Sequence, residues 1–432
     1  MKFKILILLC LTIFTNLYSQ RIENFESKYV YIINVDGIIN SIMANYIIRN
    51  IENIERKGDG IIILRIDTPG GILDSTRDIV LKIMNTKIPV IGYVSPKGAR
   101  AASAGAFIML ACDLLAMCET SHIGAAHPVN LGQKLDKTME EKILNDTIAF
   151  ILNIASKNKK NPEIAKLMVT KSLSLTASEA KDKKICDLIS NDVNDLLLKL
   201  RNYRIKKDSS NIQIKLRKPE IKSIKMSSVE RFLFNISHPN IAYILLILGI
   251  YGILAEFSTP GVGFAGVVGS ISLILALFAL NTLPVNLAGL LLIALSVALF
   301  ILELTLQSGG ILALGSVTSL ILGSFMLIKT PSLFLKISPY LIITVSLFTA
   351  IFFAVIIFYG LKIQSKKPKT GSEGIIGLRG YAKTDIKPEG EVFVKGERWQ
   401  AISYKNQQIN KDEKIEVVGI KNLKLIVKKV KK

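Results

Sequence analysis

The fold of the first domain is decided by a short apolar run that ends in a glycine turn, Ile61-Ile62-Ile63-Leu64-Arg65-Ile66-Asp67-Thr68-Pro69-Gly70-Gly71. Similar β-branched runs lie before and after it, at residues 29–35 and 88–94, and helix-length segments separate the three. This alternation predicts a mostly parallel sheet covered by helices. Because chemistry in such folds lies at the carboxyl ends of the strands, residues 67–71 form the first candidate site.

The length of the chain, 432 residues, indicates more than one domain. The composition changes along the chain in a way that suggests where the boundaries lie. We expect a signal peptide at residues 1–20, an α/β domain at 21–200, a basic linker at 201–236, a membrane bundle at 237–365 and a β-rich domain at 371–432.

The N-terminal segment has the pattern of a secretory signal. Lys2 and Lys4 precede an apolar run, and the small residue Ser19 predicts cleavage between Ser19 and Gln20. A retained signal anchor is the alternative. In either case the α/β domain is expected to be exported.

Hydrophobicity is nearly continuous from Ile241 to Leu361, and its interruptions fit bilayer-length helices. These helices are expected near residues 241–257, 262–280, 285–305, 310–329 and 338–361. The first two are joined so closely that one of them is alternatively a re-entrant segment, so four or five helices are expected. For Glu256 and Glu303, near helix ends, contact with lipid headgroups is favoured over a functional role.

The charge of the chain is strongly basic, with a net value of +21 from 55 Lys and Arg and 34 Asp and Glu. No recognised nucleic-acid motif accompanies it, so we expect no nucleic-acid partner. The linker carries ten basic and three acidic residues between positions 201 and 231, which suits anionic lipid headgroups. A solvated linker is an equal alternative.

The charge pattern also suggests an orientation in the membrane. The cluster Lys366-Lys367-Pro368-Lys369 follows the last apolar run, as expected of a cytoplasmic flank. The sequence therefore predicts a multi-pass protein of the cytoplasmic membrane with an exported α/β domain and a cytoplasmic tail. The basic linker opposes this orientation on charge count alone.

The tail and the cysteines complete the outline. From Gly371 onward, short stretches with alternating apolar residues lie between turn residues, which predicts a small barrel. The four cysteines have no metal-ligand spacing and are interpreted as core residues. We expect neither a metal nor another cofactor.

The strongest candidate nucleophile is Ser103, in Gly98-Ala99-Arg100-Ala101-Ala102-Ser103-Ala104-Gly105-Ala106. The stretch follows a predicted strand and opens a predicted helix, whose free N–H groups favour an oxyanion. Gly70, Gly71 and Ala104 are candidate oxyanion donors, because backbone N–H groups at such turns can face a substrate carbonyl. The alternative makes Ser103 an ordinary helix cap and residues 69–71 an ordinary turn.

A serine nucleophile needs a base, and two residues are candidates. His127 lies in Ile123-Gly124-Ala125-Ala126-His127-Pro128, after a predicted strand. Lys142 lies at the front of a predicted helix, and it can act as a base only if burial lowers its pKa. The residues alone favour a surface lysine there.

Taken together, these motifs resemble the long-form NfeD proteins, membrane-bound serine proteases of the ClpP class. The resemblance rests on the order of the motifs quoted above and on later ones, including Ser174-Leu175-Thr176-Ala177-Ser178-Glu179-Ala180, Glu256-Phe257-Ser258-Thr259-Pro260-Gly261 and Gly396-Glu397-Arg398-Trp399. It implies a ClpP/crotonase-like α/β domain, a transmembrane helical bundle and a C-terminal OB-type β-barrel.

The resemblance also implies a site. Ser103 would be the nucleophile and Lys142 the base. Gly71 and Ala104 would form the oxyanion hole, with Gly70 as a further candidate donor. His127 stays as the alternative base, because related ClpP peptidases use a histidine. Arg100 departs from the small or polar residue expected at its position and would change the substrate cleft.

The implied partners are a hydrophobic peptide substrate, a stomatin-like membrane protein, membrane lipid and further copies of the chain. A catalytically inactive scaffold that organises a stomatin-like assembly is the main rival. An acyl-CoA enzyme of the crotonase type also suits the fold, but acyl-CoA is scarce outside the cytoplasm.

Overall fold

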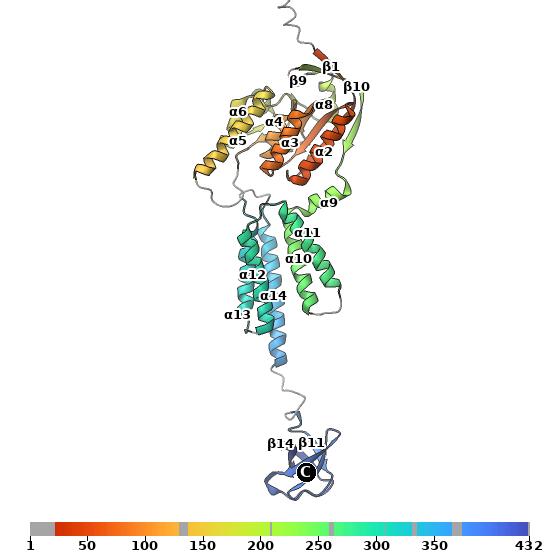
Figure 1. The fold of residues 1–432 in the computed structure, drawn as a ribbon, viewed down its shortest axis with the longest axis vertical. Coiled ribbons are helices and arrows are strands. Elements are labelled where there is room, and N and C mark those ends of the chain that lie inside the picture. The colour runs from red at the N-terminus through yellow and green to blue at the C-terminus, as the bar shows by residue number, and fades with distance from the viewer. Residues whose placement is uncertain are drawn as a thin grey trace, which may run out of the picture. The chain divides into compact units, whose positions relative to one another are not determined.

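The structure, a computed structural model, describes residues 22–128, 137–207, 210–258, 263–306, 308–330, 335–364 and 374–430 (Figure 1). The chain divides into two compact units, Met1–Thr305 with Leu314–Leu347, and Leu306–Ala313 with Phe348–Lys432. The predicted signal segment, the turn after Ser258 and the basic cluster at 366–369 lie outside the described residues.

A seven-stranded sheet forms the centre of the first domain, in the order β8-β5-β3-β2-β1-β10-β9 (Figure 1). Neighbouring strands are parallel except for the pair β9 and β10. The strands are β1 (Ile22–Asp36), β2 (Gly60–Asp67), β3 (Val90–Val94), β5 (Leu114–Met117), β8 (Leu188–Ile189), β9 (Arg204–Lys207) and β10 (Ser210–Ile224). The mostly parallel sheet that the apolar runs predicted is therefore confirmed.

Alternate side chains of the central strands enter two different cores. Ile62 and Leu64 of β2 pack into the larger core, whereas Ile61 and Ile63 pack into a smaller core on the opposite face with helix α8 (Val193–Leu200). The helices of the larger core are α2 (Ser41–Lys57), α3 (Leu73–Asn85), α4 (Ala104–Ala111), α5 (Lys137–Lys157), α6 (Pro162–Thr170) and α7 (Ala177–Asp182). Burial on both faces explains why the strand sequences are continuously apolar.

A smaller sheet lies beside the main one and carries the candidate nucleophile. It consists of β4 (Arg100–Ala102), β6 (His122–Gly124) and β7 (Ser174–Thr176), in the order β4-β6-β7. Thr68, just after β2, forms an isolated parallel bridge with Ala101 of β4. The carboxyl end of the large sheet is thus joined to the strand that precedes Ser103.

The prediction of a basic linker at residues 201–236 is wrong, because this segment belongs to the fold. β9 and β10 extend the sheet, and β10 pairs with β1 from Ile22 opposite Asn211 to Ile33 opposite Ile224. Ile212, Ile214 and Leu216 alternate with half-buried residues and enter the smaller core. The many basic residues of the segment masked this two-residue period.

Helix α9 (Ser228–Ile236) follows β10 and is fixed to the α/β domain by Glu230. The Glu230 carboxylate pairs with Arg49 of α2 at 2.7 Å and accepts the N–H of Ser227 at 2.9 Å. Phe234 of α9 lies against Gly37, where an added Cβ would be 3.2 Å from its ring. These contacts set the position of α9 just before the first membrane helix.

The anchoring of α9 is expected to weaken in acid. Partial burial raises the pKa of Glu230, but the N–H of Ser227 and the Arg49 guanidinium lower it by more, so the net shift is below the usual 4.5. A lowered pKa means that the ionised form is stabilised in the folded state, so its contribution is lost as pH falls through and below about 4.5. The protection factors of α9 amides, which are exchange rates corrected for the intrinsic rate at each pH, should therefore fall between about pH 5 and pH 3 in the parent and less in Glu230→Gln.

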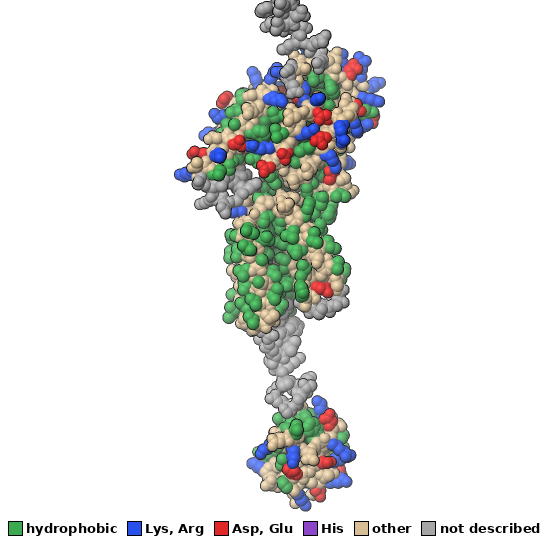
Figure 2. Space-filling view, viewed as in Figure 1, with side chains coloured by type: hydrophobic (Ala, Val, Ile, Leu, Met, Phe, Trp, Pro, Cys, Tyr) green, Lys and Arg blue, Asp and Glu red, His purple; other side chains and the backbone are tan. Residues whose placement is uncertain are grey.

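Apolar helices follow α9, and hydrophobic side chains cover their outer surface (Figure 2). They are α10 (Pro239–Ser258), α11 (Phe264–Asn281), α12 (Leu287–Leu306), α13 (Ile311–Leu327) and α14 (Pro339–Gln364). Among the described residues, three helices are long and apolar enough to cross a membrane, whereas α13 and Pro339–Val355 of α14 are shorter apolar stretches. Glycines allow close packing in this region: Gly252 and Gly269 bring the backbones of α10 and α11 together.

The two acidic residues in this region are both held by protein. The Glu256 carboxylate accepts the N–H groups of Gly263 and Gly266, at 3.0 and 3.2 Å, and so caps the start of α11. Glu303 is only 4% exposed, so it is buried among helices. The expected headgroup contact therefore does not describe Glu303, and Glu256 has a defined structural role.

The C-terminal region forms a closed five-stranded barrel in the order β11-β12-β13-β15-β14. Its strands are β11 (Arg379–Ala382), β12 (Glu389–Val394), β13 (Glu397–Ser403), β14 (Lys414–Lys421) and β15 (Lys424–Lys429). Alternate residues such as Val392 and Val394 fill its interior. The small barrel predicted from the alternating pattern is confirmed.

Candidate active site

Ser103 occupies a strained turn between β4 and α4. Its backbone angles are φ 50° and ψ −113°, in a region that non-glycine residues seldom adopt and that raises the energy by about 1–3 kcal/mol. Its N–H donates to the carbonyl of Gly124 at 3.1 Å, and all eight residues of α4 behind it are buried. A sharp strand-to-helix turn of this kind presents a nucleophile at the start of a helix.

The interpretation of Ser103 as an ordinary helix cap is wrong. Its side chain accepts no hydrogen bond from the first turn of α4. The hydroxyl also makes no hydrogen bond to any residue that the structure describes, although the side chain is half-buried. A helix cap would stabilise the helix through this oxygen, whereas here the oxygen stays available for chemistry.

The turn after β2 lies directly against Ser103. An added Cβ on Gly70, which has φ +120°, would be 2.7 Å from Cβ of Ser103 and 3.2 Å from its Oγ. Two backbone hydrogen bonds connect the turn to β4: the N–H of Thr68 donates to Arg100, and the N–H of Ala102 donates to Thr68, at 2.8 and 3.1 Å. Only glycine permits this close approach at position 70.

The three candidate oxyanion donors differ in availability. The N–H of Gly70 donates to Oγ1 of Thr68 at 3.0 Å, so that donor is engaged within the turn. The N–H groups of Gly71 and Ala104 have no acceptor among the described residues. The structure therefore leaves Gly71 and Ala104 as the available pair, and it gives Gly70 a steric role.

His127, the alternative base, is positioned by a hydrogen bond of its imidazole ring and by backbone hydrogen bonds of the two residues before it. Its Nδ1 lies 2.7 Å from the carbonyl of Val169, which can only accept, so this nitrogen carries the proton. In the neutral ring Nε2 is then free to accept a proton. Backbone bonds from Ala125 to Leu173 and from Ala126 to Met168 fix the segment, and the side chain is exposed.

Lys142 is exposed and is not hydrogen-bonded to Ser103 in this structure. It lies on α5, whose first six described residues, Lys137–Lys142, are all exposed, and no hydrogen bond joins its side chain to Ser103. Figure 1 shows the start of α5 projecting from the body of the α/β domain. A neutral lysine base needs a desolvated environment, and the structure does not supply one at Lys142.

Two residues that build this site were not among the predicted site residues. Thr68 holds the 67–71 turn through its hydroxyl, and Gly124 accepts the Ser103 N–H. An added Cβ on Gly124, which has φ +134°, would be 2.2 Å from the carbonyl oxygen of Leu173. Both residues lie inside the quoted motifs, which was the available signal for a role at the site. Their contacts form only when strands that are distant in sequence pair, so the motifs alone did not reveal them.

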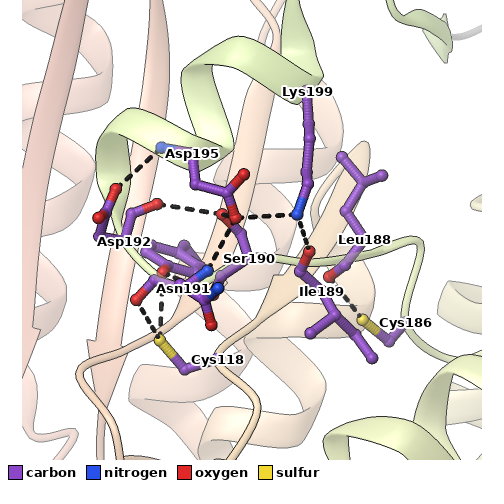
Figure 3. A network of polar contacts seen from close by, with 10 residues as sticks. Cys118, Cys186, Leu188, Ile189, Ser190, Asn191, Asp192, Asp195 and Lys199 are labelled. Carbon is purple, nitrogen blue, oxygen red and sulfur yellow. Dashed lines mark hydrogen bonds and ion pairs between the residues drawn. The ribbon is translucent and has the colours of Figure 1, made fainter.

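The three described cysteines are core residues, as expected, and not candidate nucleophiles, whereas Cys10 lies outside the described residues. Cys112, Cys118 and Cys186 are free and buried. Burial raises the pKa of Cys186 to about 12, so its thiol stays protonated. Figure 3 shows Cys118 and Cys186 donating to backbone carbonyls beside a network in which Ser190, Asn191 and Lys199 bind the Asp195 carboxylate.

Comparison with known proteins identifies the family. The chain matches "NfeD1b, N-terminal domain" over residues 29–207, "NfeD integral membrane domain" over 240–378 and "NfeD-like C-terminal, partner-binding domain" over 372–429. It is 35% identical over 414 residues to the membrane-bound protease PH1510 of Pyrococcus horikoshii, covering 93% of this chain and 94% of that protein. The chain belongs to the NfeD family.

Two further similarities accompany this NfeD assignment. The membrane protein NfeD1b of Bacillus subtilis is 28% identical over 444 residues, with 94% of each chain covered. A solved structure of the "1510-N membrane protease specific for a stomatin homolog" from Pyrococcus horikoshii is 30% identical, covers 49% of this chain and 99% of that one, and has a TM-score of 0.42.

The resemblance to long-form NfeD proteins is thus confirmed, since all three regions match. The fold class is confirmed in its architecture as well: an α/β domain with a mostly parallel sheet, apolar membrane helices and a small closed barrel. The chain is a membrane protein. Among the described residues, no group of three His, Cys, Asp or Glu lies together as a metal site.

Proposed function

We propose that this NfeD protein is a membrane-bound serine endopeptidase in which Ser103 attacks the carbonyl carbon of a peptide bond. The observation that carries the proposal is the strained Ser103 turn, with an unbonded hydroxyl at the start of a buried helix. Strain of this kind persists where the surrounding structure enforces it, often at sites of chemistry. The relative PH1510, named a membrane-bound protease, supports the same activity.

The proposed reaction proceeds through an acyl-enzyme. Oγ of Ser103 adds to the carbonyl carbon, its proton passes to the base, and the negative charge that develops on the carbonyl oxygen is bound by the N–H groups of Gly71 and Ala104. One such donor contributes about 10²–10³ in rate. The base returns the proton to the departing amine, and a water molecule then releases the acyl group. These steps use side-chain and backbone groups alone.

The proposed base is Lys142, with His127 as the alternative. Because Lys142 is exposed, the dyad requires α5 to move when substrate binds or copies of the chain to assemble, which is consistent with the proposed homo-oligomer. Either event would desolvate the amine and lower its pKa.

The base is tested by comparing Lys142→Ala, His127→Ala and Lys137→Ala in the full chain, reconstituted in lipid nanodiscs. Loss of the base is expected to slow cleavage of a hydrophobic peptide by about 10²–10⁴-fold in Lys142→Ala. Cleavage should persist in Lys137→Ala, the matched control on the same exposed helix end. A large loss in His127→Ala together with full activity in Lys142→Ala would assign the base to the histidine.

The proposed substrates are hydrophobic segments of membrane-associated proteins, including a stomatin-like partner. The support is that a solved relative is described as specific for a stomatin homolog and that the barrel matches a partner-binding domain. The proposed orientation places the α/β domain outside the cytoplasm and the barrel inside, next to membrane lipid. If the reconstituted protein cuts no peptide from the C-terminal region of a stomatin, this part of the proposal fails.

The exposure of Lys142 favours one rival, a catalytically inactive scaffold that binds a stomatin-like partner. The scaffold needs no deprotonated amine near Ser103. Replacement of Ser103 separates the two functions. It should abolish cleavage by a peptidase, whereas a scaffold cleaves no peptide with or without Ser103.

A further inference from the structure

A cavity of about 430 Å³ lies where the α/β domain meets the first membrane helices. One wall is the carboxyl edge of the sheet, with Asp36 at the end of β1 and Asp67 at the end of β2. The opposite wall comes from the end of α9 and the start of α10, with Phe234 and Ile241. This volume lies within the range of ligand pockets, roughly 300–1,000 Å³.

The cavity adjoins the candidate active site. Pro69 and Arg100 line it. Pro69 precedes Gly70, whose backbone lies against Ser103, and Arg100 begins the short strand that ends just before Ser103. A peptide chain that passes Ser103 would therefore place neighbouring residues in the cavity. The unexpected Arg100 side chain shapes this cavity.

The walls of the cavity differ in polarity. Phe234, Ile241 and Leu283 provide apolar surface, and Ile241 belongs to a candidate membrane span that begins at Pro239. The apolar wall therefore lies next to the membrane-spanning region, within reach of a segment that leaves the bilayer.

The polar wall carries the carboxylates of Asp36 and Asp67 and the guanidinium of Arg100. Asp36 is exposed and forms no ion pair with any described residue, whereas Oδ1 of Asp67 accepts the N–H of Arg100 at 3.1 Å. Burial lowers the pKa of His238, which also lines the cavity, so this ring is neutral near pH 7. Its Nδ1 accepts the N–H of Asn240. The Asp36 carboxylate is thus placed to receive a cation.

We propose that this cavity is a substrate subsite that binds a Lys or Arg residue bordering an apolar segment at the membrane surface, with the cation on Asp36 and the apolar residues on Phe234 and Ile241. This inference rests on the proposed peptidase function and adds a substrate class to it. Lys and Arg commonly flank membrane-embedded segments and extend their charge toward the headgroups. Such a segment carries both a cation, which suits Asp36, and apolar side chains, which suit Phe234 and Ile241.

The test compares two peptides that differ only in Lys or Gln beside the apolar segment, using the full chain in nanodiscs. The parent is expected to cleave the Lys peptide about tenfold more efficiently, as a charge-assisted hydrogen bond allows. Asp36→Asn should remove this preference, so that the Lys and Gln peptides are cleaved with similar efficiency. Asp182→Asn, an exposed aspartate outside the cavity, should behave as the parent.

A second variant fills the cavity. Ile241→Trp should raise KM for both peptides several-fold, whereas Ile244→Trp, at a 45% exposed position of the same helix that does not line the cavity, should not. Retention of the Lys preference in Asp36→Asn would overturn the subsite.

Binding separates this inference from the peptidase proposal. In the Ser103→Ala background, fluorescence anisotropy should show tighter binding of the Lys peptide, and Asp36→Asn should abolish the difference. If the parent cleaves nothing but this binding preference holds, the peptidase proposal fails and the subsite stands. If cleavage occurs but neither binding nor cleavage depends on Asp36, the subsite fails alone.

Discussion

Replacing Ser103 by alanine is expected to reduce peptide cleavage by about 10⁴-fold or more, because the proposed acyl-enzyme forms on its hydroxyl. The variant should fold normally, since the Ser103 hydroxyl makes no hydrogen bond with any described residue. Cleavage of a hydrophobic peptide by the full chain in nanodiscs is the measurement. Ser174→Ala, at an exposed position of β7, is the control and should retain activity.

A second readout makes this prediction sharper. A fluorophosphonate probe should label the parent and Ser174→Ala, but not Ser103→Ala. If peptide cleavage is the same in Ser103→Ala as in the parent, the assignment of this nucleophile is wrong. If the parent binds peptide but neither cleaves it nor accepts the probe, the scaffold function is supported.

Replacing Lys207 by methionine is expected to destabilise the α/β domain by about 3–5 kcal/mol, the usual effect of breaking a buried ion pair. Lys207 of β9 pairs with Asp113 at 2.9 Å, and their side chains are only 5% and 7% exposed. The same Asp113 oxygen accepts the N–H of Val90, at the start of β3. The substitution would remove the Lys207 ammonium from the buried Asp113 carboxylate.

The measurement is thermal or denaturant unfolding of the full chain in detergent, followed by a signal from the α/β domain. Lys206→Met is the matched control, because Lys206 is the neighbouring residue in the same strand and is exposed. It should change stability by less than about 0.5 kcal/mol. Equal stability of the two variants would contradict the finding that β9 is an integral part of the sheet and would return residues 201–207 to a linker.

Local patterns in the sequence were sufficient for much of the architecture. Runs such as Ile61–Ile66 predicted the central strands, and the long apolar stretch predicted the apolar helices α10 to α14 to within a few residues at their ends. Four or five bilayer-length helices were expected, whereas three of the described helices are long and apolar enough to cross a membrane. Both patterns report whether a segment is buried on one side, on all sides or not at all. The family motifs placed Ser103 at a strand-to-helix turn, where the structure has it.

The basic segment at 201–236 shows where local patterns fail. Its pairing with β1 joins residues far apart in the chain, such as Asn34 and Ser223, which are 189 positions apart. The apolar residues that face the core are few, and the surrounding lysines and arginines dominate any composition average. Only the pairing with β1 shows that Ile212, Ile214 and Leu216, which lie two positions apart, are buried.

The sequence by itself determined the nucleophile candidate, the order of the three regions and the family, because these depend on residue type and on spacing between near neighbours. The tertiary structure alone decided that Gly70 gives its N–H to Thr68, that Lys142 is exposed and that Asp36 faces a cavity beside Ser103. The availability of an N–H group, the solvation of a side chain and the distance between two residues depend on which distant segments pack together. Spacing along the chain does not specify this packing.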